Sequence, residues 1–265
     1  MPIAERQTDT VRGRMSWLEA GAGWPVILLH AFPLDARMWR PQLETVPAGW
    51  RFLAPDLRGF GSGPPLDGAA SMDGYAADVA ALMDALHLDD AAIGGLSMGG
   101  YVAFAFHRAA PARCTRMILA DTRAPADSPQ ARAARMQMRE LLAEGGPAGI
   151  AAQMLPKLLT PAAPLETVAA VRAMIESTPP TAIAAAIGAL MDRPDATPQL
   201  ARIACAALVV VGDGDAITPP AEAEAMHHAI PRSTLAILPG AGHLANLEQP
   251  AAFSRALHDF LMSAL

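Results

Sequence analysis

The sequence predicts an α/β protein built on a doubly wound, mostly parallel β-sheet. Short runs of apolar residues, typical of strands buried on both faces, alternate along the chain with segments of helical periodicity. Several of these runs end in loops rich in glycine or aspartate, and parallel sheets collect their functional sites at the carboxyl ends of the strands. The chain has 265 residues, of which 52% are hydrophobic, and this is enough apolar material for a sizeable core.

The predicted elements follow in a regular order. Residues 11–19, with a turn at 21–23, are expected to form an opening strand pair. The further predicted strands are 26–29, 51–54, 91–93, 116–120, 207–211 and 235–238. Helical periodicity predicts helices at 75–86, 101–108 and 250–265.

One long stretch interrupts the alternation. Between Asp121 and residue 206 no strand is visible, and helical patterns rich in alanine, leucine, methionine and arginine are separated by prolines. A span of about 85 residues is too long for a connecting loop, and its helices are expected at about 128–144, 147–158, 165–176 and 180–192. We therefore expect a core domain formed by residues 1–121 and 207–265, and a helical cap formed by residues 122–206.

A lone serine stands between a predicted strand and a predicted helix. Ser97 has Gly95 two residues before it and Gly99 two residues after it. This pattern is typical of a nucleophile elbow, in which a tight turn projects the hydroxyl and neighbouring side chains would collide with the backbone. Met98 would open the helix, and its unpaired backbone N–H could receive a developing oxyanion.

A serine nucleophile needs a base, and the base needs an acid to orient it. His243 is the strongest candidate for the base because it follows a predicted strand in a glycine-rich loop. For the acid we favour Asp215, with Asp213 as the alternative and Asp121 as a third candidate. Each of these residues follows a predicted strand, so the parallel sheet would bring all of them to one edge.

Five motifs spread over nearly the whole chain carry a family resemblance. They are His30–Asp35, Asp56–Ser62, Gly95–Gly100, Gly212–Asp215 with Pro219, and Gly242–Pro250. On these motifs the chain resembles the α/β-hydrolase fold superfamily, and within it the branch of carboxylesterases, enol-lactone hydrolases and cofactor-free perhydrolases. Ala31 departs from the pattern, because this branch usually has glycine there. The Asp56/Arg58 loop is expected to brace the end of the sheet.

The resemblance implies an α/β-hydrolase fold with an inserted helical cap and a serine hydrolase mechanism. It implies Ser97, Asp215 and His243 as the catalytic triad, and the backbone N–H groups of Phe32 and Met98 as the oxyanion hole. The implied substrate is a small to medium carboxylic ester or lactone, such as an enol-lactone or an acyl-homoserine lactone, cleaved without metal or organic cofactor. A perhydrolase with the same triad and a non-hydrolytic ligand receptor on the same fold are the alternatives.

The predicted cap is rich in methionine and leucine, which could line an apolar pocket, although helix packing is the simpler interpretation for most of them. Arg132, Arg135 and Arg139 share one helical face. We expect this face to be solvated, with contact to a substrate carboxylate as the alternative.

Composition narrows the class of partner. The net charge is −6 and no basic run appears, so we expect no nucleic-acid partner. No apolar stretch approaches the length of about 18 residues that a membrane span needs, and the polar first residues predict no secretory signal. Cys114 and Cys205 have no metal-like spacing and are expected to be reduced, as in the cytoplasm. The sequence is compatible with a homo-oligomer.

Overall fold

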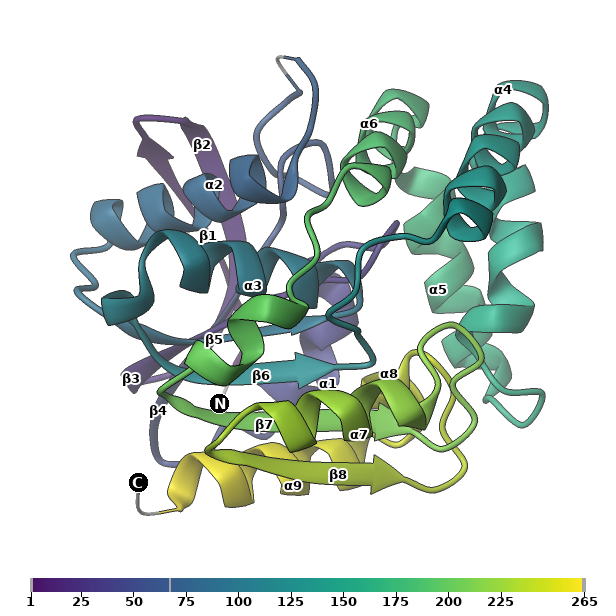
Figure 1. The fold of residues 1–265 in the computed structure, drawn as a ribbon. Helices are drawn as coiled ribbons and strands as arrows, with labels where there is room; N and C mark the ends of the chain where they lie inside the picture. The colour runs from purple at the N-terminus through teal and green to yellow at the C-terminus, as the bar shows by residue number, and fades with distance from the viewer. Residues whose placement is uncertain (1, 67, 264–265) are drawn as a thin grey trace.

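An eight-stranded sheet forms the centre of the molecule (Figure 1). The computed structural model describes residues 2–66 and 68–263. In chain order the strands are β1 Ala4–Thr10, β2 Gly13–Gly21, β3 Gly23–Leu29, β4 Gly49–Pro55, β5 Ala91–Leu96, β6 Cys114–Ala120, β7 Ala206–Gly212 and β8 Ser233–Leu238. Across the sheet the order is β1-β2-β4-β3-β5-β6-β7-β8, with β2 antiparallel to both neighbours and all later pairs parallel. The predicted doubly wound, mostly parallel sheet is therefore confirmed.

Helices pack on both faces of this sheet (Figure 1). The helices outside the segment between β6 and β7 are α1 Arg40–Leu43, α2 Met72–Ala85, α3 Met98–Ala109, α7 Pro220–Ala229, α8 Ala245–Glu248 and α9 Pro250–Met262, with the short 3-10 helices η1 Ala36–Trp39 and η2 Pro111–Arg113. Helix α3 packs on β5 and β6, whereas α9 packs on β7 and β8 and contacts α1 and α8. Every residue of β5 and β7 is buried, which explains why these strands appear in the sequence as continuous apolar runs.

The chain between β6 and β7 contains the 3-10 helix η3 Thr197–Arg202 and three α-helices, and the α-helices lie beyond the carboxyl ends of the strands (Figure 1). They are α4 Pro129–Leu158, α5 Leu165–Ser177 and α6 Pro180–Met191. Helix α4 is interrupted at Gly146, whose φ of 60° and ψ of −163° are not helical, and the interruption divides it near the predicted boundary between 144 and 147. The division into a core and a cap domain stays a prediction.

The structure corrects the prediction for the amino-terminal strands. The hairpin joins β1 to β2, and its turn lies at Val11 and Arg12, not at residues 21–23. At residues 21–23 the chain passes from β2 to β3, which are separated in the sheet by β4. Strand β1 was not predicted because this edge strand is mostly polar and carries charged side chains, a common protection of exposed sheet edges.

Most other predicted boundaries lie within a few residues of the observed ones. Helix α2 begins at Met72 because the hydroxyl of Ser71 accepts a hydrogen bond from the backbone N–H of Gly74 at 2.9 Å. The predicted carboxyl-terminal helix corresponds to α9, although residues 264–265 of the predicted range lie outside the described residues. Among the described residues, no helix combines the length and the apolar composition that crossing a membrane requires.

Candidate active site

Ser97 occupies a strained turn between β5 and α3. Its φ of 54° and ψ of −111° lie in a region that residues with a side chain seldom adopt. A Cβ atom on Gly95 would lie 2.0 Å from the carbonyl carbon of Gly99, and one on Gly99 would lie 2.1 Å from the carbonyl oxygen of Leu29. Both glycines are therefore needed for the turn, because α3 leaves Ser97 directly against the ends of β5 and β3.

The structure brings Ser97, His243 and Asp215 into one chain of hydrogen bonds. The Ser97 hydroxyl lies 2.8 Å from Nε2 of His243, and Nδ1 of the same ring lies 2.8 Å from Oδ2 of Asp215. An ionised carboxylate can only accept, so Nδ1 carries the proton and Nε2 is left to accept from the hydroxyl. The arrangement can remove a proton from the Ser97 hydroxyl.

Asp215 is held by the loop that follows it. Its Oδ1 accepts from the backbone N–H groups of Ile217 at 2.8 Å and Thr218 at 2.9 Å, and its Oδ2 accepts from the Thr218 hydroxyl at 2.6 Å. Burial opposes ionisation, but the hydrogen bonds and charge of His243 and the bonds of Thr218 outweigh it, so the pKa of Asp215 is lowered. This contact was not predicted from the sequence.

The other two candidate acids, Asp213 and Asp121, bind backbone N–H groups. The Asp213 carboxylate accepts from the backbone N–H of Gly240 at 2.8 Å, so it links the loop after β7 to the loop after β8. Asp121 is completely buried, has a φ of 42°, and accepts from the backbone N–H of Gly212 at 2.9 Å. Burial, and next the charge of Asp215, raise the pKa of Asp121 well above its usual range. Its buried position therefore favours the protonated form of Asp121.

Glu248 fixes the loop that carries His243. Its Oε2 accepts from the backbone N–H of Gly242 at 2.7 Å, directly before His243. Its Oε1 accepts from the backbone N–H of Thr160 at 2.8 Å and from the Thr160 hydroxyl at 2.5 Å, so the same carboxylate ties this loop to the end of α4. No role was predicted for Glu248, although it belongs to one of the motifs that carry the resemblance.

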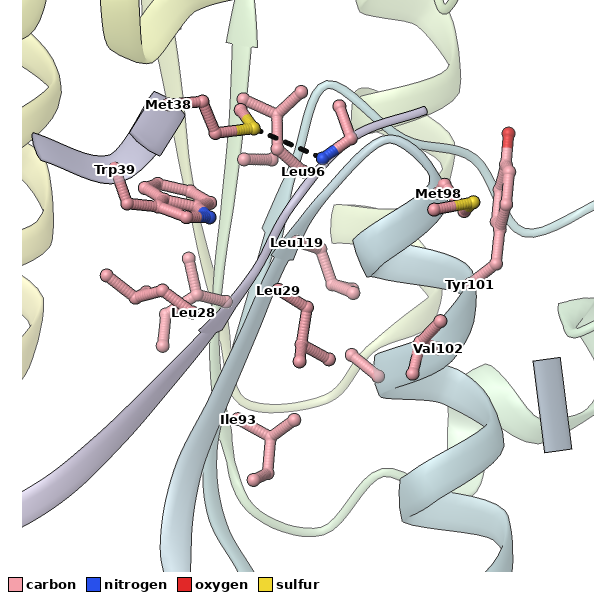
Figure 2. Close-up of a cluster of buried hydrophobic side chains, with 14 of the residues drawn as sticks. Leu28, Leu29, Met38, Trp39, Ile93, Leu96, Met98, Tyr101, Val102 and Leu119 are labelled. Carbon is pink, nitrogen blue, oxygen red and sulfur yellow. Dashed lines mark hydrogen bonds between the residues drawn. The ribbon is translucent and has the colours of Figure 1, made fainter. Parts of the chain in front are cut away.

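The loop after β3 brings Phe32 to the same edge of the sheet. The backbone N–H of Ala31 points to the sulfur of Met38 at 3.2 Å, and both lie in a buried apolar cluster with Leu29 and Met98 (Figure 2). Among the described residues other than glycine, positive φ occurs only at His87, Ser97 and Asp121. Ala31 therefore keeps ordinary backbone angles, and glycine is not required at its position.

The Asp56 loop and His30 brace this region. Asp56 accepts from the backbone N–H groups of Ala36 at 2.8 Å and Ser62 at 2.9 Å. His30 Nε2 lies 3.1 Å from the backbone nitrogen of Leu57, which donates to it. Burial lowers the pKa of His30, so this neutral ring links the ends of β3 and β4.

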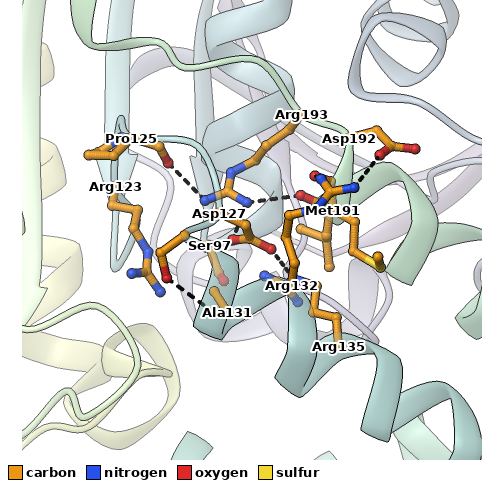
Figure 3. A network of polar contacts seen from close by, with 12 residues as sticks. Ser97, Arg123, Pro125, Asp127, Ala131, Arg132, Arg135, Met191, Asp192 and Arg193 are labelled. Carbon is orange, nitrogen blue, oxygen red and sulfur yellow. Dashed lines mark hydrogen bonds and ion pairs between the residues drawn. The ribbon is translucent and has the colours of Figure 1, made fainter.

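A second polar network anchors the base of α4 and α6 (Figure 3). The side chain of Asp127 is 1% exposed and forms ion pairs with Arg193, whose side chain is 2% exposed, and with Arg135 at 2.5 Å. The guanidinium carbon of Arg193 also lies 4.2 Å from the ring centroid of Tyr101, on the helix that begins after Ser97. Burial opposes ionisation of Asp127, but Arg135 and Arg193 together hold its pKa below the usual value.

The three arginines of the predicted solvated face have different surroundings. Arg135 is bound to Asp127, and Arg132 contacts Asp192 at 3.2 Å and the carbonyl of Met191. Arg139 is exposed. Arg132 therefore links α4 to the end of α6, and Arg135 links α4 to the loop before it, structural roles that the spacing alone did not reveal.

A polar cleft of about 510 Å³ opens beside the Phe32 loop. Its lining includes Arg6, Asp35, Arg37 and Asp56 but not Ser97, His243 or Asp215. This cleft is therefore separate from the hydrogen-bonded chain, and its Arg37 is already bound to Asp35 at 2.6 Å. Among the residues that the structure describes, no group of three or more histidine, cysteine or acidic side chains has the arrangement of a metal site.

The fold and this site have the features of one large class of enzymes. The model of the alpha/beta hydrolase family matches residues 26–256, so the chain belongs to that family. This confirms the resemblance found in the sequence.

Individual relatives agree with this assignment. A thermophilic esterase from Thermogutta terrifontis, solved with malate bound, is 41% identical and superimposes with a TM-score of 0.91 over 97% of this chain and 98% of that chain. The 3-oxoadipate enol-lactonase 2 of Acinetobacter baylyi is 30% identical over 88% of this chain and 86% of that protein. The pimeloyl-[acyl-carrier protein] methyl ester esterase of Neisseria meningitidis is 30% identical over 91% of this chain and 93% of that protein.

Proposed function

We propose that this protein hydrolyses small to medium carboxylic esters or lactones through an acyl-enzyme formed on Ser97. The observation that carries the proposal is the continuous hydrogen-bonded chain from Asp215 through His243 to Ser97, with the serine on an elbow between β5 and α3. Geometry of this kind can activate a hydroxyl that is otherwise a weak nucleophile.

The proposed reaction has two halves. Ser97 Oγ attacks the carbonyl carbon while His243 Nε2 takes the hydroxyl proton, and Asp215 stabilises the imidazolium that forms. His243 then protonates the leaving alcohol oxygen, which departs and leaves the acyl group on Ser97. Water, deprotonated by the same ring, attacks the acyl-enzyme and releases the acid.

We assign the oxyanion hole to the backbone N–H groups of Phe32 and Met98. Met98 is the first residue of α3, so its N–H has no acceptor within the helix. The close approach of Gly99 to the end of β3 brings the start of α3 beside the loop that carries Phe32. Each such donor typically stabilises the transition state by about 3 kcal/mol.

We assign residues 122–206 to a cap over the site and residues 1–121 and 207–265 to the core. This assignment is supported by the position of α4, α5 and α6 beyond the carboxyl ends of the strands (Figure 1). It is also supported by the hydrogen bond that the backbone N–H of Leu244, next to His243, donates to the carbonyl of Leu158 at 3.1 Å. The buried apolar residues of α4 would then face the acyl group.

The relatives support an ester or lactone as the substrate. One is named an enol-lactonase and another a methyl ester esterase. The C–O bond of a lactone and that of an ester can both be cleaved by the same acyl transfer. We place the activity in the cytoplasm, because both cysteines are free thiols.

A panel of p-nitrophenyl esters and lactones of graded acyl length tests the proposal. We expect multiple turnovers with short and medium acyl chains, and a loss of at least about a thousandfold in kcat for Ser97→Ala with unchanged circular dichroism. A single slow release of product by the wild type would instead indicate a ligand receptor. Turnover by Ser97→Ala near the wild-type rate would remove Ser97 from the mechanism.

A further inference from the structure

The two cysteines, which lie 91 positions apart in the sequence, occupy neighbouring strands of the sheet. Cys114 is the first residue of β6, and Cys205 directly precedes Ala206, the first residue of β7. β6 and β7 are parallel neighbours. Both cysteines are free, and each thiol lies close enough to shift the pKa of the other.

A β-bulge explains why these two side chains meet. Arg116 on β6 is paired with Ala206 on β7. Two consecutive residues of β5 pair with Cys114 and Arg116, so Thr115 is an extra residue in β6. In the pairing register of the two strands, Cys114 therefore lies one position before Arg116, just as Cys205 lies one position before Ala206.

The two thiols have different surroundings. Cys114 is 4% exposed, and its Sγ lies 3.4 Å from the carbonyl oxygen of Arg116. Cys205 is half-buried, and the Arg232 guanidinium reaches the carbonyl of the preceding residue at 3.5 Å. The neighbouring Cys114 thiol lowers the pKa of Cys205, and the charge of Arg232 adds to this effect. Cys205 is thus the more accessible thiol and the one better able to ionise.

We propose that Cys114 and Cys205 are a modification site at which a hydroperoxide forms an intrachain disulfide. The Cys205 thiolate attacks one peroxide oxygen, the O–O bond breaks, and Cys205 becomes a sulfenic acid while the second oxygen leaves as water or alcohol. The Cys114 sulfur then attacks the Cys205 sulfur, the S–O bond breaks, and water leaves with the Cys114 proton. In sum, two thiols are oxidised and one peroxide is reduced.

The position of the pair determines what the bond would change. It would join the amino ends of β6 and β7, and the enclosed loop would contain β6 and all of α4, α5 and α6. Closing so long a loop restricts the unfolded chain. Ser97 lies at the opposite ends of these seven-residue strands, about 20 Å away. Oxidation is therefore expected to stabilise the fold without inhibiting the enzyme.

The test exposes the full-length protein to hydrogen peroxide, blocks remaining thiols with iodoacetamide, and maps peptides by mass spectrometry without reduction. We expect a linked peptide pair containing Cys114 and Cys205, reversed by dithiothreitol, and a Tm raised by about 5 °C or more. Ester turnover should change less than about twofold. Two alkylated cysteines under conditions that oxidise a free cysteine peptide, or a lowered Tm of the linked protein, would overturn the proposal.

Two variants examine the order of events. Cys114→Ser should stop at the Cys205 sulfenic acid, which dimedone traps, whereas Cys205→Ser should leave the buried Cys114 alkylatable only after unfolding. Equal dimedone labelling of both variants would contradict the assigned roles. The wild-type peptide map decides the main proposal even if a variant folds poorly, and it does not depend on the reaction proposed for Ser97.

Discussion

At the scale of single residues, Thr218 is the side chain that most directly supports Asp215. Its hydroxyl donates to Oδ2, the same oxygen that accepts from His243. Thr218→Val keeps the shape and removes this bond, and we expect kcat/KM to fall about tenfold because a bond to a charged acceptor contributes about 1.5 kcal/mol or more. Thr218→Ser is the matched control and should stay near wild type. Equal activity of the valine and serine variants would exclude this role.

Asp121 makes the stability of the fold depend on pH. Its pKa is raised in the folded protein, so the folded state holds a proton that the unfolded chain releases above about pH 3.9. The contribution of Asp121 to the free energy of unfolding is therefore fully present below that pH, and it is lost as the pH rises towards the pKa of Asp121 in the folded protein. Asp121→Asn does not titrate and keeps an oxygen for the backbone N–H of Gly212.

Urea unfolding of Asp121→Asn and wild type at several pH values measures this effect. The stability of the variant relative to wild type should increase with pH within that window, by at most about 1.4 kcal/mol per pH unit. A difference that stays constant or shrinks as pH rises would show that Asp121 is ionised in the folded state.

At the scale of elements, the buried ion pair between Arg193 and Asp127 is central to the network that attaches α4 and α6. Arg193 pairs with Asp127, donates to the carbonyl of Pro125 at 2.8 Å, and lies over the ring of Tyr101. Arg193→Ala leaves Asp127 buried with less compensation, and we expect the free energy of unfolding to fall by about 3 kcal/mol or more.

Arg132→Ala is the matched control, because the Arg132–Asp192 pair is exposed, with side-chain exposures of 45% and 77%. It should cost less than about 1 kcal/mol. Denaturant unfolding measures both variants. Similar losses for the two would mean that burial of the Arg193 pair adds nothing to the stability of the fold.

At the scale of the whole molecule, local patterns predicted the parallel strands and the elbow well. Fully buried strands such as β5 and β7 appear as apolar runs, and the elbow needs glycines at fixed offsets from Ser97, so both leave a local signal. The edge strand β1 leaves none, because its polar side chains resemble those of a loop.

Contacts between distant segments were harder to predict. Glu248 reaches Thr160 and Gly242 only because the end of α4 folds back onto the His243 loop. Cys114 and Cys205 meet through strand order and one bulged residue, which no spacing in the sequence encodes. The choice of Asp215 over Asp213 likewise depends on which carboxylate the turn directs at the imidazole.

Covalent labelling tests the role of Ser97 most directly. A fluorophosphonate reacts with a serine that a neighbouring imidazole activates. We predict that one equivalent labels the wild type, that the modified peptide contains Ser97, and that Ser97→Ala and His243→Ala are not labelled. Labelling of another residue, or equal labelling of the wild type and Ser97→Ala, would contradict the account.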